Sequence, residues 1–181
     1  VVSIATDTYW PYTVLLLNGE GTAATNNAQN NTLVDSSASA ITITRNGDIV
    51  QGTFSPFSAS SWSNYFDGSG DYLTAPSNAA FQFGTGDFTI ECWIYLLGTA
   101  GNYTIYDSRT AGSSVSINWY FQGSNNLSLM VSGTNRIAQG SAFPANVWRH
   151  VALSRVSGST KLFVNGTQAG STYTDANDYN Q

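Results

Sequence analysis

The sequence predicts an all-β fold, in the form of a two-sheet antiparallel β-sandwich of the jelly-roll type. Many short segments alternate apolar and polar residues, which is the period of a strand with one face in a core. Turns rich in Gly, Asn and Ser separate these segments. No segment of ten or more residues carries apolar residues at helical spacing, so helix should be confined to a turn or two around residues 77–81. With 181 residues, 41% of them hydrophobic, the chain suits one domain with one core.

The first 50 residues are predicted to hold an arm and three short strands. Residues 1–12 should form an N-terminal arm, because their proline resists both a helix interior and a central strand. Residues 14–17 are a short apolar run, as expected for a strand covered on both faces, and residues 18–39 have the composition of an irregular loop. Residues 41–44 alternate cleanly, and an Asn-Gly-Asp turn then leads to a strand at residues 49–50.

The strand predicted at residues 88–96 has the strongest alternation. One face carries Phe, Ile, Cys, Ile and Leu, and the other carries Thr, Glu, Trp and Tyr. Because both faces hold bulky side chains, we expect this strand to be central in its sheet. Cys92, the single cysteine, then lies in the core as a small apolar residue, and the chain can form no intrachain disulfide.

The remaining strands follow the same pattern of alternation and turns. Asn165-Gly166 favours a two-residue type I′ hairpin, because both residues tolerate positive φ. The predicted strands lie at residues 115–121, 127–131, 148–155, 161–164 and 167–171.

Four motifs in this series resemble those of the laminin-G-like, concanavalin A-like lectin/glucanase family. They are the Tyr-Phe-Asp-Gly-Ser-Gly-Asp-Tyr-Leu sequence at residues 65–73 and the segments at residues 88–96, 148–153 and 162–166. The resemblance covers roughly residues 13–175. It implies a concanavalin A-like sandwich over residues 13–181 that follows the arm, and its form resembles domains in phage and bacterial surface proteins.

The C-terminal end differs from the pattern that the resemblance implies. In that family the chain usually continues beyond the hairpin through further strands, one of which lies near the first strand. This sequence ends in the polar residues 179–181. We therefore expect the sandwich to be C-terminally incomplete, with its last strands lying beyond residue 181 or supplied by a neighbouring chain.

The charge composition excludes several classes of partner. Charged residues make up 9% of the chain, against about 25% in an ordinary globular protein. The net charge is −5 with six Lys and Arg together, so the field needed to attract nucleic acid or an anionic membrane is absent. No apolar run reaches the length that spans a bilayer. A surface built from hydroxyls and amides, with 13% aromatic residues, is typical of a β-protein on a virion surface or outside the cell.

The sequence offers little for catalysis, and we expect the protein not to be an enzyme. Related glucanases use two carboxyl groups that flank one glycosidic bond at about 5–5.5 Å. Glu20 has no second carboxylate two or four positions away, and Glu91 is the single carboxylate within its predicted strand. His150 is the single histidine and Lys161 the single lysine, so zinc sites and His-based triads have no partners.

Aspartates near turns are the candidate metal ligands. Asp67 and Asp71 flank a Gly-Ser-Gly sequence and could ligate Ca²⁺, which prefers hard oxygen ligands. The alternative is that each carboxylate accepts hydrogen bonds from its own turn, as Asp beside Gly commonly does. Asp48 and Asp107 are further candidates near strand ends, although Asp107 could equally form a local ion pair with Arg109.

Five tryptophans and ten tyrosines give the positive indication of ligand binding. Sugars stack their C–H faces on aromatic rings while amides, carboxylates and backbone groups bind their hydroxyls. Asn118 and Tyr120, on the polar face of their strand, and Tyr103, near a strand start, are the candidate ligand-binding residues. Packing or a subunit interface is the alternative for all three.

These observations lead to three functional hypotheses. The first is a non-enzymatic virion or cell-surface module, such as a phage tail-fibre, receptor-binding or capsid-decoration protein that binds a cell-surface glycan. The second is a purely architectural subunit that contacts only other virion or surface subunits, in a homo-oligomer. The third is the carbohydrate-binding module of a larger glycan-active enzyme. No cofactor is expected apart from calcium.

Overall fold

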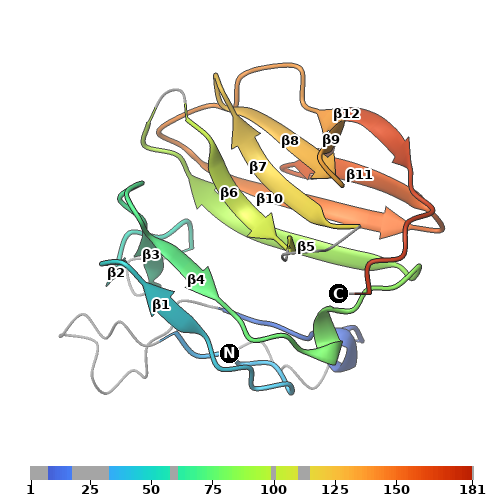
Figure 1. Ribbon diagram of the computed structural model, residues 1–181. Helices are drawn as coiled ribbons and strands as arrows, with labels where there is room; N and C mark the ends of the chain where they lie inside the picture. The colour runs from blue at the N-terminus through green and yellow to red at the C-terminus, as the bar shows by residue number, and fades with distance from the viewer. Residues whose placement is uncertain (1–7, 18–32, 58–60, 99–100, 110–114, 181) are drawn as a thin grey trace. The chain divides into compact units, whose positions relative to one another are not determined.

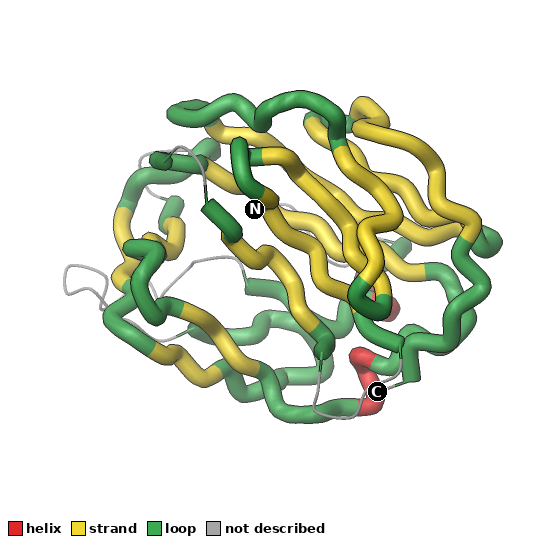
Figure 2. Tube along the Cα trace, turned by 45° about the horizontal axis from the view of Figure 1, so that its top comes forward, coloured by secondary structure: helices red, strands yellow, loops and turns green. Residues whose placement is uncertain are grey.

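The computed structural model describes residues 8–17, 33–57, 61–98, 101–109 and 115–180. Within it the chain forms two compact units, an N-terminal unit (Val1–Ala80) and a C-terminal unit (Phe81–Gln181). Strands dominate the C-terminal unit, whereas the N-terminal unit has short strands joined by longer loops (Figures 1 and 2). The helical segments of the described residues are single 3-10 turns, η2 (Trp10–Tyr12) and η3 (Ala79–Phe81). The 3-10 turn η3 agrees with the helical turn predicted around residues 77–81.

The C-terminal unit is a sandwich of two four-stranded antiparallel sheets, which confirms the predicted fold class (Figure 1). The first sheet has the strand order β12-β11-β10-β5 and the second has the order β6-β7-β8-β9. The strands of the first sheet are β5 (Phe88–Tyr95), β10 (Trp148–Val156), β11 (Ser159–Val164) and β12 (Thr167–Thr174). Those of the second sheet are β6 (Tyr103–Asp107), β7 (Ile117–Gln122), β8 (Asn126–Val131) and β9 (Thr134–Ala138).

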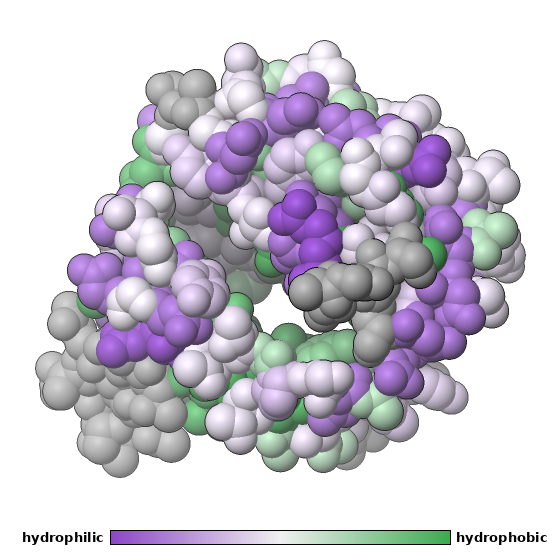
Figure 3. Space-filling model, in the orientation of Figure 1, coloured by the Kyte–Doolittle hydropathy of each residue, from purple (hydrophilic) through white to green (hydrophobic). Residues whose placement is uncertain are grey.

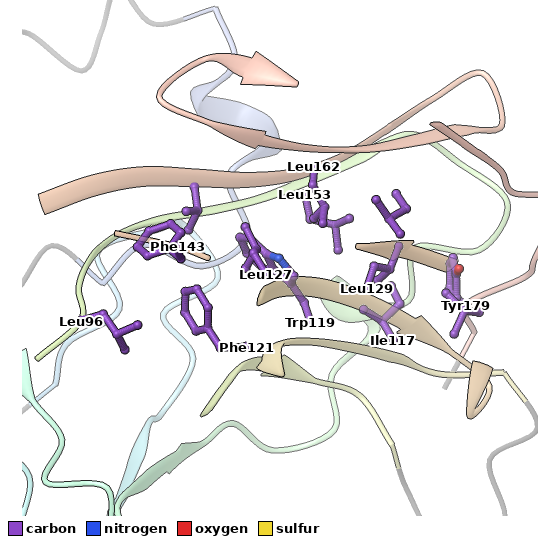
Figure 4. Packing of buried hydrophobic residues seen from close by; sticks show 13 residues of the cluster. Leu96, Ile117, Trp119, Phe121, Leu127, Leu129, Phe143, Leu153, Leu162 and Tyr179 are labelled. Carbon is purple, nitrogen blue, oxygen red and sulfur yellow. The ribbon is translucent and has the colours of Figure 1, made fainter. Parts of the chain in front are cut away.

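Alternation along β7 supplies the centre of the core between the two sheets. Ile117, Trp119 and Phe121 are buried there, and with Leu153 of β10 and Leu162 of β11 they belong to one cluster of apolar side chains (Figure 4). Burying one such side chain contributes about 1.5–3 kcal/mol relative to leaving it in water. The core therefore depends on the period-two pattern that the sequence shows.

Tight turns and one close approach fix the path of the C-terminal strands. Asn165 and Gly166, between β11 and β12, both adopt positive φ, at 48° and 76°, as predicted for their hairpin. The register of β12 against β11 shifts near Thr160, and Gly170 occupies the irregular stretch with φ of 74°. A Cβ atom at Gly170 would overlap the carbonyl oxygen of Ala138 in β9. Glycine is needed there both for its backbone conformation and for the contact between β12 and β9.

A fully buried arginine ties the chain end to the sandwich. The Nε of Arg155 donates a hydrogen bond to the carbonyl oxygen of Gly86 at 2.7 Å. Its Nη2 donates to the carbonyl oxygen of Gly84 at 2.7 Å, and its Nη1 donates to that of Asn177 at 2.9 Å. The guanidinium thus joins the segment before β5 to the segment after β12.

The carboxylate of Asp175 completes this buried cluster. Its Oδ2 accepts hydrogen bonds from the hydroxyls of Thr160 (2.7 Å) and Tyr179 (2.9 Å), and lies 3.8 Å from Nη1 of Arg155. The guanidinium also lies over the rings of Phe88 and Tyr179, at 5.0 and 4.9 Å from their centroids. Burial, together with the charge of Asp175, raises the pKa of the Tyr179 phenol above its ordinary value. The residues that the sequence suggested to be a polar chain end therefore include a core tyrosine.

The N-terminal unit contains two two-stranded antiparallel sheets, β1-β4 and β2-β3 (Figure 1). The strands are β1 (Thr44–Asn46), β2 (Val50–Gly52), β3 (Ser63–Tyr65) and β4 (Tyr72–Thr74). β1 and β2 each share only one residue with the strands predicted at 41–44 and 49–50, because both begin at the last residue of the predicted range. They pair with β4 and β3 rather than with each other. Arg45 donates a hydrogen bond to the carbonyl oxygen of Ile49, so a side chain bridges the turn between them.

The prediction of a strand at residues 14–17 is wrong, because this segment has no ladder partner in the described part of the chain. The N–H of Leu16 instead donates to the carboxylate of Asp35 at 2.9 Å, and the carbonyl of Leu16 accepts from the N–H of Ser36. Asp35 also accepts from the N–H groups of Ser37 and Ile41. The N–H of Leu16, which a strand would pair in a sheet, is thus satisfied by a buried carboxylate, and its carbonyl is satisfied by a neighbouring backbone N–H. Most of the predicted loop at residues 18–39 lies outside the described residues.

Two further expectations are corrected. Pro11 was expected to resist a helix, yet it lies within η2, because the first turn of a helix needs no donor from that nitrogen. The strand at residues 88–96 was expected to be central, but β5 is the last strand of its sheet as described. Its inner face packs on the core, whereas Glu91 and Trp93 on its outer face are exposed. Bulky side chains on both faces of a strand therefore do not show whether the strand is central or is an edge strand with exposed aromatic residues.

Polar residues cover much of the surface. In the view of Figure 3, hydrophilic and near-neutral residues dominate, as the low charge and high Ser, Thr and Asn content predict. None of the helices in the described part of the chain has the length and apolar character needed to cross a membrane.

Candidate functional site

The candidate site is the outer side of the sheet β6-β7-β8-β9, which we call the polar face. Alternation along β7 sends Asn118, Tyr120 and Gln122 to the side opposite the core. The register of the sheet places neighbours from the other strands beside them. By register, the polar face carries Met130 and Ala138 together with the polar residues Thr104, Asp107, Asn118, Tyr120, Gln122, Asn126, Ser128 and Asn135.

A row of hydrogen bonds joins three of these side chains. The hydroxyl of Tyr120 donates to Oδ1 of Asn135 at 3.0 Å, and Nδ2 of Asn135 donates to Oε1 of Gln122 at 3.1 Å. Tyr120 is 7% exposed, whereas Asn135 and Gln122 are exposed. The row therefore runs from a buried hydroxyl to two accessible amides, each of which still offers donor and acceptor capacity.

Asn118 lies beside this row and is 4% exposed. Its Nδ2 is buried and has no hydrogen-bond partner in the described structure. A buried donor without an acceptor costs about 1–3 kcal/mol. The polar face thus holds one amide whose hydrogen-bonding capacity the protein itself does not use.

Asp107 and Arg109 form an ion pair next to Asn118. Nε of Arg109 donates to both carboxylate oxygens, and its Nη2 lies 2.5 Å from Oδ2. Burial would raise the pKa of Asp107, but the hydrogen bonds from Arg109 outweigh it and hold that pKa below its usual value. Hydrogen bonding to Asp107 raises the pKa of Arg109. The sequence left open whether Asp107 is a metal ligand or forms an ion pair with Arg109. The structure contains the ion pair.

The third candidate ligand-binding residue lies on the other side of the sheet. Tyr103, the first residue of β6, is in register with Phe121 and packs against the core cluster. The structure therefore brings Asn118 and Tyr120 together with Asp107 on one face and leaves Tyr103 out. Its position matches the packing alternative.

Asp48, Asp67 and Asp71 meet in the N-terminal unit and form what we call the acidic turn. One carboxylate oxygen from each lies within 4.8 Å of the others. Asp71 accepts hydrogen bonds from the N–H groups of Asp67 and Asp48, both at 2.9 Å, and Asp67 accepts from the N–H of Ser69 at 2.6 Å. The hydrogen bond from the Asp67 N–H is the main reason that the pKa of Asp71 lies below its usual value. The carboxylates shape the turn as the alternative reading predicted, and their remaining lone pairs fit a hard cation such as Ca²⁺.

Glu91 and His150 face each other across β5 and β10. Oε2 of Glu91 lies 3.5 Å from Nε2 of His150, and Glu91 is well exposed. Neighbouring Cys92 points the other way and packs against the core. Burial, and to a smaller extent the charge of Glu91, raises the pKa of the Cys92 thiol to about 12, as suits a small apolar core residue.

A family model described as the concanavalin A-like lectin/glucanases superfamily matches residues 67–181, which is more than half of the sequence. The chain belongs to this superfamily. The match spans the acidic turn's Asp67 and Asp71 and the whole C-terminal unit. Comparison with curated protein sequences gives no match.

Two solved structures share the superfamily fold with this chain. Domain 4 of AbnA, an extracellular GH43 arabinanase from Geobacillus stearothermophilus in complex with arabinotriose, matches with a TM-score of 0.64 and 19% identity, over 84% of this chain and 74% of that one. The binding domain of Paraclostridial Mosquitocidal Protein 1 matches with a TM-score of 0.65 and 13% identity, over 93% of this chain and 42% of that one. At these identities the likeness concerns the fold.

Sequence reasoning missed the two accessible amides of the polar face. Asn135 lies on β9, whose five residues include a single large aliphatic side chain, so the strand gives almost no periodic signal. Gln122 follows the predicted strand end at residue 121 by one position. Extending the alternation of β7 by that one residue would have found Gln122, whereas the pairing of β9 with β8 was needed to find Asn135.

Proposed function

We propose that this protein is a non-enzymatic carbohydrate-binding module, displayed outside the cell or on a virion, that binds a glycan on its polar face. The observation that carries the proposal is the hydrogen-bonded row from Tyr120 through Asn135 to Gln122. Side-chain amides pair well with sugar hydroxyls, because each amide donates and accepts.

The relatives of the fold support this class of ligand. One of the two similar structures was solved in complex with arabinotriose, and the other is the binding domain of a larger protein. A glycan-binding role also agrees with a surface built from amides and hydroxyls rather than charges.

The described carboxylates support binding rather than hydrolysis. Glu91 faces an imidazole rather than a second carboxylate across the sheet. In the acidic turn, Asp71 accepts two backbone hydrogen bonds that favour its charged form, which is the opposite of what a general acid needs. We expect no release of reducing ends when the protein is incubated with arabinan, laminarin or xylan. Release at a rate that Glu91→Gln abolishes would show an enzyme.

Glycan binding is tested with a glycan array followed by titration calorimetry on the strongest ligand. We expect Asn135→Ala combined with Gln122→Ala to weaken binding tenfold or more, while Tyr120→Phe, which removes one hydroxyl, has a smaller effect. Gln168→Ala is the matched control, because Gln168 is an exposed, hydrogen-bonded amide on the opposite sheet. Equal affinities of the double variant and the control would contradict the assignment to the polar face.

A second candidate function is a purely architectural subunit of a virion or surface assembly. The deep burial of Asn118 and Tyr120 favours it, because ligand-contacting side chains are usually accessible. In that case no glycan should bind, and the protein should form a homo-oligomer. Light scattering after size-exclusion chromatography, together with an empty glycan array, would support this candidate.

Calcium binding at the acidic turn is a separate part of the proposal. Asp48, Asp67 and Asp71 would supply carboxylate oxygens, and backbone carbonyls or water would complete the coordination. Calorimetric titration with CaCl₂ tests it. We expect saturable heat that Asp67→Asn removes, and no heat in the unmodified protein would exclude the site.

A further inference from the structure

A cluster of exposed side chains lies on the outer face of the other sheet, opposite the polar face across the core. Trp93 of β5 is 42% exposed, and the side chain of neighbouring Glu91 is 61% exposed. His150 of β10 is in register with Trp93, and its side chain is 29% exposed. We call these three residues the aromatic site.

The geometry of the aromatic site holds an indole ring beside two polar groups. The rings of Trp93 and His150 lie 5.5 Å apart, inclined by 58°. Glu91 Oε2 and His150 Nε2 lie 3.5 Å apart, at the outer limit of a hydrogen bond, so both groups keep capacity for other partners. The backbone of His150 is held by Asn165, whose Oδ1 accepts from the His150 N–H and whose own N–H donates to the His150 carbonyl. A rigid hairpin therefore positions the imidazole.

We propose that the aromatic site is a second sugar-binding site, which binds one unit of a neutral glycan by stacking it on Trp93. The C–H face of the sugar would cover the exposed part of the indole, and neighbouring hydroxyls would donate to the Glu91 carboxylate and pair with His150. This inference rests on the proposed function only for the class of ligand, since it concerns different residues on a different sheet.

The chemistry of the three side chains selects a sugar over other occupants. An apolar protein surface or a lipid would remove the Glu91 carboxylate from water and leave it only the His150 imidazole 3.5 Å away, which costs several kcal/mol. A nucleic acid would bring phosphates against that carboxylate and against a chain of net charge −5. Sugar hydroxyls satisfy a carboxylate and an imidazole while a C–H face covers the ring. An acidic sugar would be repelled by Glu91, so the ligand is a neutral one.

The next pair of residues in register on β5 and β10 extends the surface of the aromatic site. Tyr95 and Trp148 are in register, and their rings lie 5.5 Å apart in an edge-to-face arrangement. Side chains two residues apart along one strand are separated by about 7 Å. A bound chain of two or more sugar units would therefore run along β5 from Trp93 toward Tyr95.

The test follows the indole N–H signals of ¹⁵N-tryptophan-labelled protein by NMR, with the Trp93 signal assigned by its loss in Trp93→Phe. Arabinotriose, xylotriose and laminaritriose, each to 10 mM, are the neutral probes, and trigalacturonic acid is the acidic one. We expect a neutral probe to shift the Trp93 signal in a saturable way and the acidic probe to leave it unmoved. Trp93→Ala should weaken binding about tenfold or more, and Glu91→Gln should weaken it severalfold.

The control is Phe66→Ala, because Phe66 is an aromatic residue of matched exposure, 44%, in the N-terminal unit. It should leave the affinity unchanged. If Trp93→Ala does not fold, Trp93→Phe and Glu91→Gln still test the site by the change in affinity.

The outcomes separate this site from the polar face. Binding that Asn135→Ala weakens while the Trp93 signal stays unmoved would overturn the aromatic site and leave the proposed function intact. A Trp93 shift that persists in Asn135→Ala would support the aromatic site as a site separate from the polar face. A Trp93 signal that moves with none of the probes overturns the inference, and a stronger response to the acidic probe overturns its choice of a neutral ligand.

Discussion

Replacement of Asp175 by Asn should destabilise the C-terminal unit more than any exposed substitution. Asp175 and Arg155 have fully buried side chains, with 3.8 Å between Oδ2 and Nη1. Asp175→Asn keeps the volume of the side chain but leaves the guanidinium buried without a counter-charge. Arg155 would retain its three carbonyl acceptors, so the change isolates the loss of charge compensation.

The magnitude follows from the burial of the pair. Removing one partner of a buried ion pair costs about 3–5 kcal/mol. For a domain of this size, each kcal/mol lowers Tm by roughly 2–4 °C, so we expect a decrease of roughly 6 to 20 °C. Asp175→Asn also removes a carboxylate oxygen that accepts hydrogen bonds from Thr160 and Tyr179, and this loss should lower the stability further.

The assay is thermal unfolding by circular dichroism at pH 7, with urea unfolding to obtain the free energy difference. Asp178→Asn is the matched control, since Asp178 is an exposed aspartate three residues further along the same segment. The double variant Arg155→Met with Asp175→Asn should lose less stability than the sum of the single changes, because neither charge then stays buried alone. A Tm for Asp175→Asn within 2 °C of the control would refute the reasoning.

Three further predictions concern other parts of the chain. In thermal unfolding, Gly170→Ala should lower Tm by much more than Gly166→Ala does. Both glycines have positive φ, but only at Gly170 would the new Cβ overlap a backbone carbonyl, that of Ala138. Equal decreases in Tm for the two variants would show that this contact is unimportant. Burial raises the pKa of the Cys92 thiol to about 12 from the ordinary 9.0. At pH 8, Cys92 should therefore react with a thiol reagent on the order of a thousandfold more slowly in the folded protein than in urea. Rapid labelling without urea would contradict the burial of this thiol. The carboxyl of Asp35 has a lowered pKa, because hydrogen bonds from N–H donors outweigh the effect of its burial. Its contribution to stability is therefore present above the unfolded pKa of about 3.9 and is lost as the pH falls through the lower folded pKa. Asp35→Asn should remove this part of the pH dependence of urea unfolding in acid, and an unchanged pH profile of the free energy of unfolding would contradict the prediction.

The sequence by itself determined the class of fold and most strands of the C-terminal unit. Strand period and turn chemistry are local properties, so alternation identified β5, β7, β8, β10 and β11, and Asn165-Gly166 identified its own turn and the return strand β12. Local rules failed for residues 14–17, where the N–H of Leu16 donates to the distant carboxylate of Asp35 rather than to a neighbouring strand. They also missed β9, where pairing with a neighbour replaces hydrophobic periodicity.

Only the tertiary structure decided which polar residues share a surface. Asn118 and Tyr120 were identified from the alternation of one strand, but their neighbours Asn135 and Asp107 come from strands on either side. The same holds for Glu91 and His150, which lie 59 positions apart in the sequence and meet through the pairing of β5 with β10. Register between strands arises from packing and long-range hydrogen bonds, which composition and period do not encode. The sequence therefore predicts a concanavalin A-like scaffold, and strand pairing assembles the two faces on which we propose that it binds sugar.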